Sequence, residues 1–212
     1  MPTSPFLATY DPSLAWEQLL HGHGEYLRHV SPNYDDVLRV VIDNVERSGS
    51  IGKADIGALL FWKRLRADSA WVRALHEWPD PQVREITARA VTAVQDTDAT
   101  LSVAARAGRS ELAALPGFAT GDALASALLL AAAPTRMAVY DRRSDAGLKS
   151  LGVQVGSTPG RYGRYMAIID KLLESAPPDA ASWHPRNVDE ALYWLGGLNP
   201  APAATTRDRQ TF

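Results

Sequence analysis

A short glycine-bounded loop, followed by an apolar segment and then by an acid, is the feature that most constrains how this chain can fold. The loop runs from Leu115 to Gly121 and reads Leu-Pro-Gly-Phe-Ala-Thr-Gly. Residues 123–133 are almost all apolar, and Asp141 lies twenty positions after Gly121. That interval accommodates a buried helix of about three turns, a turn at Pro134 and a short extended approach to a second helix. The order predicts a hairpin, a core helix and an acid that begins the next helix.

Helical periodicity recurs along the chain, and no segment shows the alternation that is typical of a strand. One segment is apolar at positions three and four apart, namely Val37, Val40, Val41 and Val45. Glycines at 22 and 24 predict that the first helix ends near Leu20. We therefore expect an all-α protein. Capping signals predict the helix starts near Asp11, Ser31, Gly52, Ser69, Asp80, Asp98 and Asn187.

Composition excludes several classes of site. The chain has 212 residues and no cysteine, so disulfides, thiolate metal sites, a cysteine nucleophile and an iron–sulfur cluster are excluded. We expect neither a metal nor another cofactor. No apolar run approaches the ~18 residues of a membrane span, and residues 1–10 lack a charged start before an apolar core. We expect a cytoplasmic protein without membrane contact.

The formal charge of −2 is unevenly distributed. Residues 1–50 contain seven acids and three bases, which gives −4, so the remainder carries +2. This excess is compatible with one modest phosphate-facing side. It is equally compatible with ordinary solvated helix faces.

The hairpin, core helix and following acid together resemble the helix-hairpin-helix DNA glycosylase superfamily, with the 8-oxoguanine glycosylase-like bacterial branch as the nearest family. The likeness covers about residues 108–196. It implies two helical subdomains flanking a DNA-binding cleft. The resemblance places an N-terminal helical subdomain at 1–107, a hairpin-bearing subdomain with the catalytic acid at 108–198 and a flexible tail at 199–212.

By this resemblance the hairpin residues Gly117, Phe118 and Gly121 contact DNA. Glycines let a backbone approach a phosphate closely, and free N–H groups at a helix start favour an anion. The family usually sets its second glycine two residues after the first, whereas here the two are four apart. Either the turn is longer or the phosphate grip is altered. The alternative is that Pro116 and Gly117 merely end one helix before the next begins.

Asp141 has two compatible interpretations. As the residue before a predicted helix it is an ordinary N-cap that accepts backbone N–H bonds. The same capping lowers a carboxyl pKa and keeps the group ionised, as a carboxylate that stabilises a positively charged sugar must be. The resemblance favours the catalytic role. It also suggests that Arg142 and Arg143 contact phosphates beside an extruded nucleotide.

The resemblance further implies a pocket that receives the extruded base, for which Tyr140, Lys53 and Trp194 are the candidates. Bifunctional members of the family carry a nucleophilic lysine near the start of the core helix. Residues 121–124 read Gly-Asp-Ala-Leu and contain no lysine. We therefore expect base hydrolysis without an amine-catalysed strand break, unless another lysine enters the site.

The resemblance therefore implies a monofunctional DNA glycosylase acting on double-stranded DNA. It would extrude a damaged or modified base and leave an abasic site, either in base-excision repair or in defence against phage DNA with modified bases. No protein partner is identified. The alternative is a non-catalytic helix-hairpin-helix module that binds DNA or protein.

Overall fold

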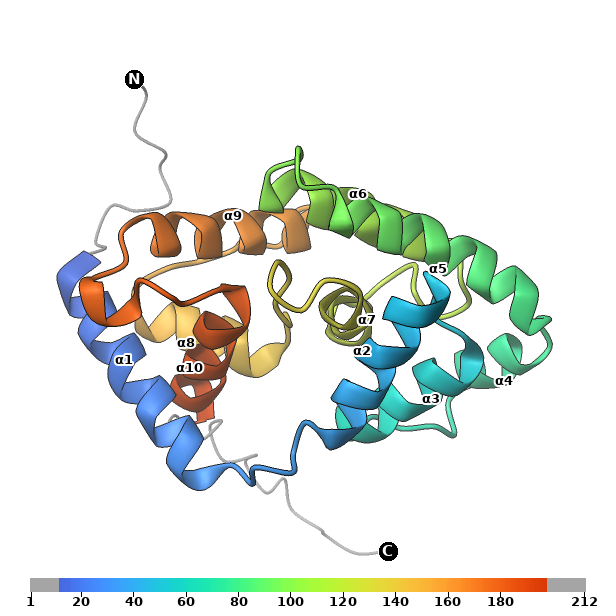
Figure 1. Ribbon diagram of the computed structural model, residues 1–212, viewed down its shortest axis with the longest axis horizontal. Coiled ribbons are helices and arrows are strands. Elements are labelled where there is room, and N and C mark those ends of the chain that lie inside the picture. Colours follow the sequence, from blue (N-terminus) through green and yellow to red (C-terminus); the bar gives the residue numbers. More distant parts are fainter. Residues whose placement is uncertain (1–11, 198–212) are drawn as a thin grey trace, which may run out of the picture.

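The computed structural model describes residues 12–197, and this part of the chain is helical without a strand (Figure 1). The all-α expectation is confirmed. The predicted cap Asp11 and the predicted tail 199–212 lie outside the described residues. The helices are α1 (Pro12–His29), α2 (Asp36–Ser48), α3 (Lys53–Trp62), α4 (Ala70–His76), α5 (Asp80–Gln95), α6 (Leu101–Leu112), α7 (Ala123–Ala132), α8 (Arg142–Ser150), α9 (Arg161–Glu174), the 3₁₀ helix η2 (Pro178–Ala180) and α10 (Pro185–Gly197).

The helices form two groups around one continuous apolar core. In the first group α10 packs against α8, α1 and α9, so the first and last described helices lie side by side (Figure 1). In the second group α7 is central and packs against α2, α3, α5 and α6. Contacts between α6 and α9 join the two groups. The expected boundary between residues 107 and 108 falls within the unbroken helix α6.

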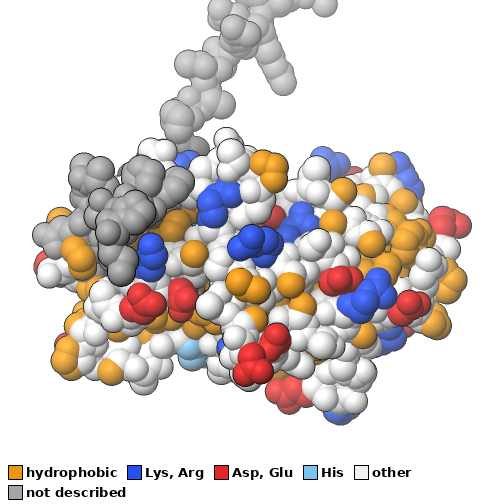
Figure 2. Space-filling model, turned by 90° about the horizontal axis from the view of Figure 1, so that it is seen from above, with side chains coloured by type: hydrophobic (Ala, Val, Ile, Leu, Met, Phe, Trp, Pro, Cys, Tyr) orange, Lys and Arg blue, Asp and Glu red, His pale blue; other side chains and the backbone are white. Residues whose placement is uncertain are grey.

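The joining helices α6 and α9 share one face of the molecule. Figure 2 looks onto this face and shows Lys and Arg side chains gathered around its middle. Among residues 12–197, no helix is both long and apolar enough to cross a bilayer.

Helix α7 lies in the core because it has no polar face. Its eight residues from Ala125 to Ala132 are all buried. A helix that is apolar on every side is stable only when neighbours cover all of it. Its alanines let those neighbours approach closely, and this confirms the expected core helix.

Three predicted details of the helices are wrong. Helix α1 does not end near Leu20 but continues through Gly22, where an added Cβ would lie 3.0 Å from Leu195 Cγ and 3.1 Å from the Ala191 carbonyl oxygen. Gly22 therefore admits α10 instead of breaking α1. Of the four valines at helical spacing in α2, which the face they share would bury together, Val41 and Val45 are buried but Val40 is 57% exposed. Thr100, not Asp98, caps α6, because its side chain accepts the N–H of Val103.

The backbones of α8 and α10 cross closely at two glycines. A Cβ at Gly147 would collide with the carbonyl group of Leu192, and one at Gly196 would collide with that of Arg143. A larger side chain at either position would separate the helices. This crossing holds the start of α8, where Asp141 lies, against α10.

Candidate functional site

Asp141 caps α8 as the sequence predicts. Its Oδ1 accepts the backbone N–H of Arg143 at 2.8 Å and that of Ser144 at 3.1 Å. In return, the Ser144 hydroxyl oxygen accepts the backbone N–H of Asp141 at 2.8 Å. This reciprocal capping box fixes the carboxylate at the helix start, where the exposed N–H groups stabilise negative charge.

Lys63 completes an ion pair with Asp141 that sequence analysis missed. Its Nζ donates to Asp141 Oδ2 at 2.6 Å, and the lysine side chain is only 9% exposed. Lys63 follows the last residue of α3 and is seven positions after the buried Ile56. Helical periodicity places both on one inward side. A lysine on a buried apolar stripe was therefore the available signal.

The backbone bends sharply just after Lys63. Arg64 has a φ of +53°, which is the left-handed conformation that usually ends a helix at glycine. The Leu65 N–H then returns to the carbonyl oxygen of Leu60 at 2.9 Å. This turn ends α3 with Lys63 directed at Asp141.

The electrostatic surroundings keep Asp141 ionised. Burial raises the pKa of its carboxyl, but the adjacent Lys63 ammonium and the N–H donors of Ser144 and Arg143 outweigh burial and leave the pKa below its usual value. Asp141 is therefore a carboxylate at neutral pH. A cation at 2.6 Å, more than the capping, makes this possible in a part-buried position.

A small cavity with aromatic walls lies beside this ion pair. It encloses about 10 Å³, which is room for about one water molecule. Lys63, Asp141 and Val139 line it together with residues from both groups of helices. Its other lining residues are Tyr26, Tyr34, Trp62, Arg186, Asp189 and Tyr193.

Arg186 is the second cation of this cavity and is 14% exposed. It forms ion pairs with Asp35 at 3.2 Å, Asp189 at 2.6 Å and Glu190 at 3.0 Å. Both cations lie near Trp62, because Arg186 Cζ is 5.6 Å from its ring centroid and Lys63 Nζ is 5.5 Å from it. The cluster joins α3 to α10 and keeps both cations beside the cavity.

Asp189 is a buried acid near the pair. Burial raises the pKa of its carboxyl to about 6, although Arg186 and Lys63 act in the opposite direction. The two acids of the cavity therefore differ: Asp141 is held ionised, whereas Asp189 titrates close to neutral pH. Different environments have driven their pKa values apart, as occurs where two carboxyls have separate roles.

The hairpin connects α6 to α7. The three hairpin residues that were expected to contact DNA differ in their surroundings. Phe118 is 2% exposed and packs edge-on against Trp71, with 5.9 Å between ring centroids. Gly117 has a φ of +84°, and a Cβ there would strike the Trp71 ring. Gly121 has a φ of +79° and open space at its Cβ position. The structure thus places Gly117 and Phe118 in packing contacts and leaves Gly121 accessible.

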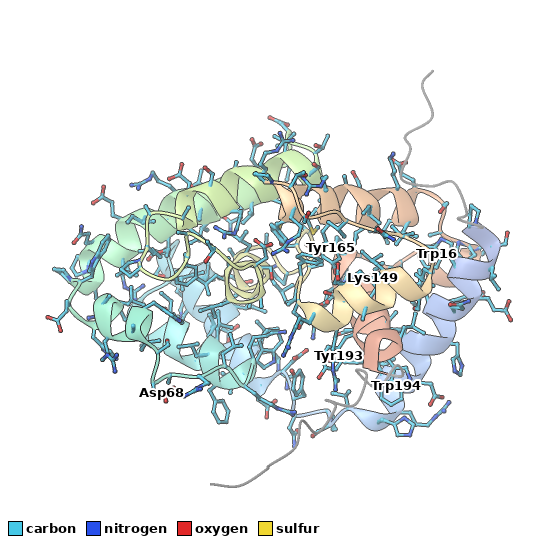
Figure 3. All side chains as sticks on the ribbon, turned by 180° about the vertical axis from the view of Figure 1, so that it is seen from behind. Trp16, Asp68, Lys149, Tyr165, Tyr193 and Trp194 are labelled. Carbon is cyan, nitrogen blue, oxygen red and sulfur yellow. The ribbon has the colours of Figure 1, made fainter. Side chains whose placement is uncertain are left out.

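The expected base-pocket residues do not line the cavity beside Asp141. Lys53 Nζ donates to the carbonyl oxygens of His76 and Trp78. The Tyr140 ring is buried against Tyr165, with 4.7 Å between their centroids. Trp194 stacks on a histidine of α1, and Figure 3 shows it directed to the α1 side of α10 while Tyr193 points towards the middle of the molecule. Trp194 and Tyr193 differ in this way because adjacent residues of a helix face different sides.

The two arginines after Asp141 are exposed at the start of α8. Arg143 Cζ lies 4.5 Å from the ring centroid of Tyr193, so this guanidinium covers one wall residue of the cavity. Arg142 has no hydrogen bond or ion pair among the described residues and remains available to a ligand.

Comparisons with known proteins yield no relative: no family model, curated protein or solved structure matches the chain. Residues 12–197 also contain no group of three or more His, Cys, Asp or Glu side chains arranged to hold a metal ion. The chemistry of the site is therefore inferred from its own residues.

Proposed function

We propose that this protein is a DNA N-glycosylase that extrudes a damaged or modified base, hydrolyses its N-glycosidic bond and leaves an abasic site. The observation that carries the proposal is the Lys63–Asp141 pair beside an aromatic-walled cavity at the start of α8. The acid follows a hairpin and a core helix, as in the glycosylase superfamily that the sequence resembles.

The arrangement suits the charge that develops during glycosidic cleavage. As the bond between C1′ and the base nitrogen breaks, its electrons leave with the base and positive charge develops on the sugar. Asp141 is ionised at neutral pH and fixed by two N–H donors, so it stabilises that charge without reorganisation. Water then adds to C1′ and loses a proton, while the departing base gains one.

Lys63 positions Asp141 in this mechanism. While it donates to Oδ2 as an ammonium group, its nitrogen has no lone pair with which to attack the sugar. The proposed reaction is therefore hydrolytic, in agreement with the absence of a lysine from residues 121–124. A covalent route would require Lys63 to lose its proton before it forms the bond to C1′.

The aromatic walls supply surfaces on which an extruded base can stack. Tyr34, Trp62 and Tyr193 are the candidates, and the Arg186 guanidinium adds a hydrogen-bond donor. A cavity of about 10 Å³ is too small for a base, so these side chains must separate when DNA binds. The small volume of the cavity also favours a second candidate function, a non-catalytic module that binds DNA without receiving a base.

An abasic-site assay distinguishes the two functions. The wild-type protein is incubated with duplexes that each carry one modified base, and with phage DNAs of different modification. We expect abasic sites, broken only by heat or alkali, on at least one substrate. Borohydride should trap no protein–DNA adduct. Absence of abasic sites across the panel would favour the binding module, and efficient trapping lost in Lys63→Gln would replace hydrolysis by the covalent route.

Asp141→Asn is the decisive variant because asparagine is as good an N-cap as aspartate but carries no charge. We expect turnover to fall by ~10² or more, with DNA affinity within a few fold. Thermal unfolding should shift to lower temperature because Lys63 loses its partner in a part-buried position, so turnover is measured well below the unfolding transition. Asp179→Asn on η2 is the matched control and should retain full turnover. An Asp141→Asn protein as active as this control would refute the proposed role.

Lys63→Gln separates positioning from folding. Without the cation, burial of Asp141 is less opposed and its pKa should rise. The acid limb of the kcat/KM profile should therefore move to higher pH. A loss of activity with an unmoved limb would show that Lys63 does not act through Asp141.

A further inference from the structure

An open groove with a surplus of positive charge lies on the face shared by α6 and α9. It has a volume of about 560 Å³, with α6 on one side and the first turn of α9 on the other. The hairpin after Ala119 and the loop 157–160 complete its walls. Lys and Arg side chains gather in the middle of this face (Figure 2). The groove shares no lining residue with the small cavity beside Asp141.

One carboxylate holds two arginines of the groove side by side. Asp122 Oδ1 accepts Arg109 Nε at 3.0 Å, and Asp122 Oδ2 accepts Arg161 Nε at 3.0 Å and its terminal nitrogen at 2.8 Å. Arg106 also lines the groove and has no hydrogen bond or ion pair among the described residues. Three guanidinium groups thus face one carboxylate, which leaves the groove with a charge of about +2.

The backbone of the groove is also suited to an anion. Gly121 and Gly160 line it with φ angles of +79° and +80°, and an added Cβ would lie within 3.4 Å of no heavy atom at either position. Within the described chain, the backbone N–H groups of residues 119–122 donate no hydrogen bond. Oriented N–H groups at such turns bind phosphate oxygens without needing a side chain.

Arg161 links the groove to the candidate catalytic site. Its Cζ lies 5.4 Å from the ring centroid of Tyr140, the residue before Asp141. The groove and the candidate catalytic site are therefore connected through one residue, Tyr140.

We propose that this groove binds the phosphodiester backbone of a DNA strand, with Arg106, Arg109 and Arg161 as its phosphate-contacting side chains. The choice of DNA rests on the proposed glycosylase function. Arginine forks match phosphate oxygens, and such contacts position a strand without reading its sequence. A strand held here keeps the duplex in place while one nucleotide is extruded towards Asp141.

Salt-dependent binding tests the groove. Affinity for a fluorescent, unmodified 20-base-pair duplex is measured by anisotropy between 50 and 200 mM NaCl, for wild type, Arg106→Gln and Arg28→Gln. Arg28 is a matched control because it is an exposed arginine at the far end of α1, away from α6 and α9 (Figure 1). Loss of one phosphate contact should reduce the slope of log K against log salt by about 0.9 in Arg106→Gln alone. Equal slopes for the two variants would overturn the proposal.

A competition experiment distinguishes a DNA strand from a free nucleotide as the ligand of the groove. Deoxynucleoside triphosphate is added to the wild-type complex, and the labelled duplex should stay bound at micromolar concentrations of this competitor. Displacement at those concentrations would overturn strand binding in favour of a small-nucleotide site.

The abasic-site assay on the same proteins separates this proposal from the proposed function. A reduced slope in Arg106→Gln without abasic sites from wild type would retain the groove and reject the glycosylase. Abasic sites from both proteins with an unchanged slope would retain the glycosylase and reject the groove.

Discussion

The cavity beside Asp141 and the groove between α6 and α9 differ in the balance of their acidic and basic side chains. In the cavity, Lys63 and Arg186 face Asp141 and Asp189, so the charges are balanced around a volume of about 10 Å³. In the groove, three arginines face Asp122 alone around about 560 Å³. Charges removed from water must be paired, whereas solvated charges need not be. The paired charges of the cavity therefore suit the proposed role of Asp141 as a fixed carboxylate, and the excess of arginine in the groove suits the proposed binding of an anion.

Two glycines of the hairpin show a similar contrast between packing and exposure. Gly117 and Gly121 both have left-handed backbones, yet Trp71 fills the space beside the first and nothing occupies the space beside the second. A conformation that only glycine adopts readily thus serves packing at one position and accessibility at the other.

The largest effect expected from breaking the charge balance is that of Arg186→Met. This change leaves Asp35, Asp189 and Glu190 without their shared cation in a desolvated position. We expect the free energy of unfolding, measured with urea, to fall by about 3–5 kcal/mol. The same change at Arg106 in the groove should alter it by less than about 0.5 kcal/mol. Similar losses at both positions would contradict the contrast between the two regions.

Asp189→Asn should produce a pH-dependent effect of somewhat smaller size. An unfolded aspartate titrates near pH 3.9, whereas burial raises the pKa of Asp189 to about 6, so the folded protein favours its protonated form. Its contribution to stability is full below about pH 4 and is lost as the pH rises through about 6. The wild-type unfolding free energy should therefore fall by up to about 3 kcal/mol relative to the variant between pH 4 and 7. A difference that is independent of pH would show that Asp189 stays ionised.

The smallest expected effect distinguishes the two hairpin glycines. Gly121→Ala meets only backbone strain and should destabilise the protein by about 1 kcal/mol. Gly117→Ala adds a collision with the Trp71 ring and should cost about 2–3 kcal/mol. Thermal unfolding of both variants measures the difference. Equal effects would mean that Trp71 moves aside freely.

Local sequence signals were sufficient for the helical class and for several elements of the site. The N-cap role of Asp141, the buried helix α7 and the starts of α3 and α5 follow from residues within one helix or its first turn. Capping and periodicity depend on neighbours up to about four positions away, so one sequence contains all the information they need.

Local signals gave wrong predictions where contact with another helix determined the structure around a residue. Glycine usually breaks a helix, but α10 lies against Gly22 and α1 continues through it. Trp194 and Tyr193 are adjacent aromatic residues, and only the position of α1 decides that the first stacks outside the cavity while the second lines it. Intrinsic preferences are weak compared with the packing of neighbouring helices.

The sequence by itself determined that Asp141 begins a helix behind a hairpin and a core helix. Only the tertiary structure decided what faces it, because Lys63 is 78 positions away and Arg186 meets Asp35 across 151 positions. Such pairs form when α3, α8 and α10 pack together, and the close crossing at Gly147 and Gly196 fixes where α8 starts. Ion pairs between distant helices have no characteristic spacing, since their geometry is set by the apolar core that the helices share.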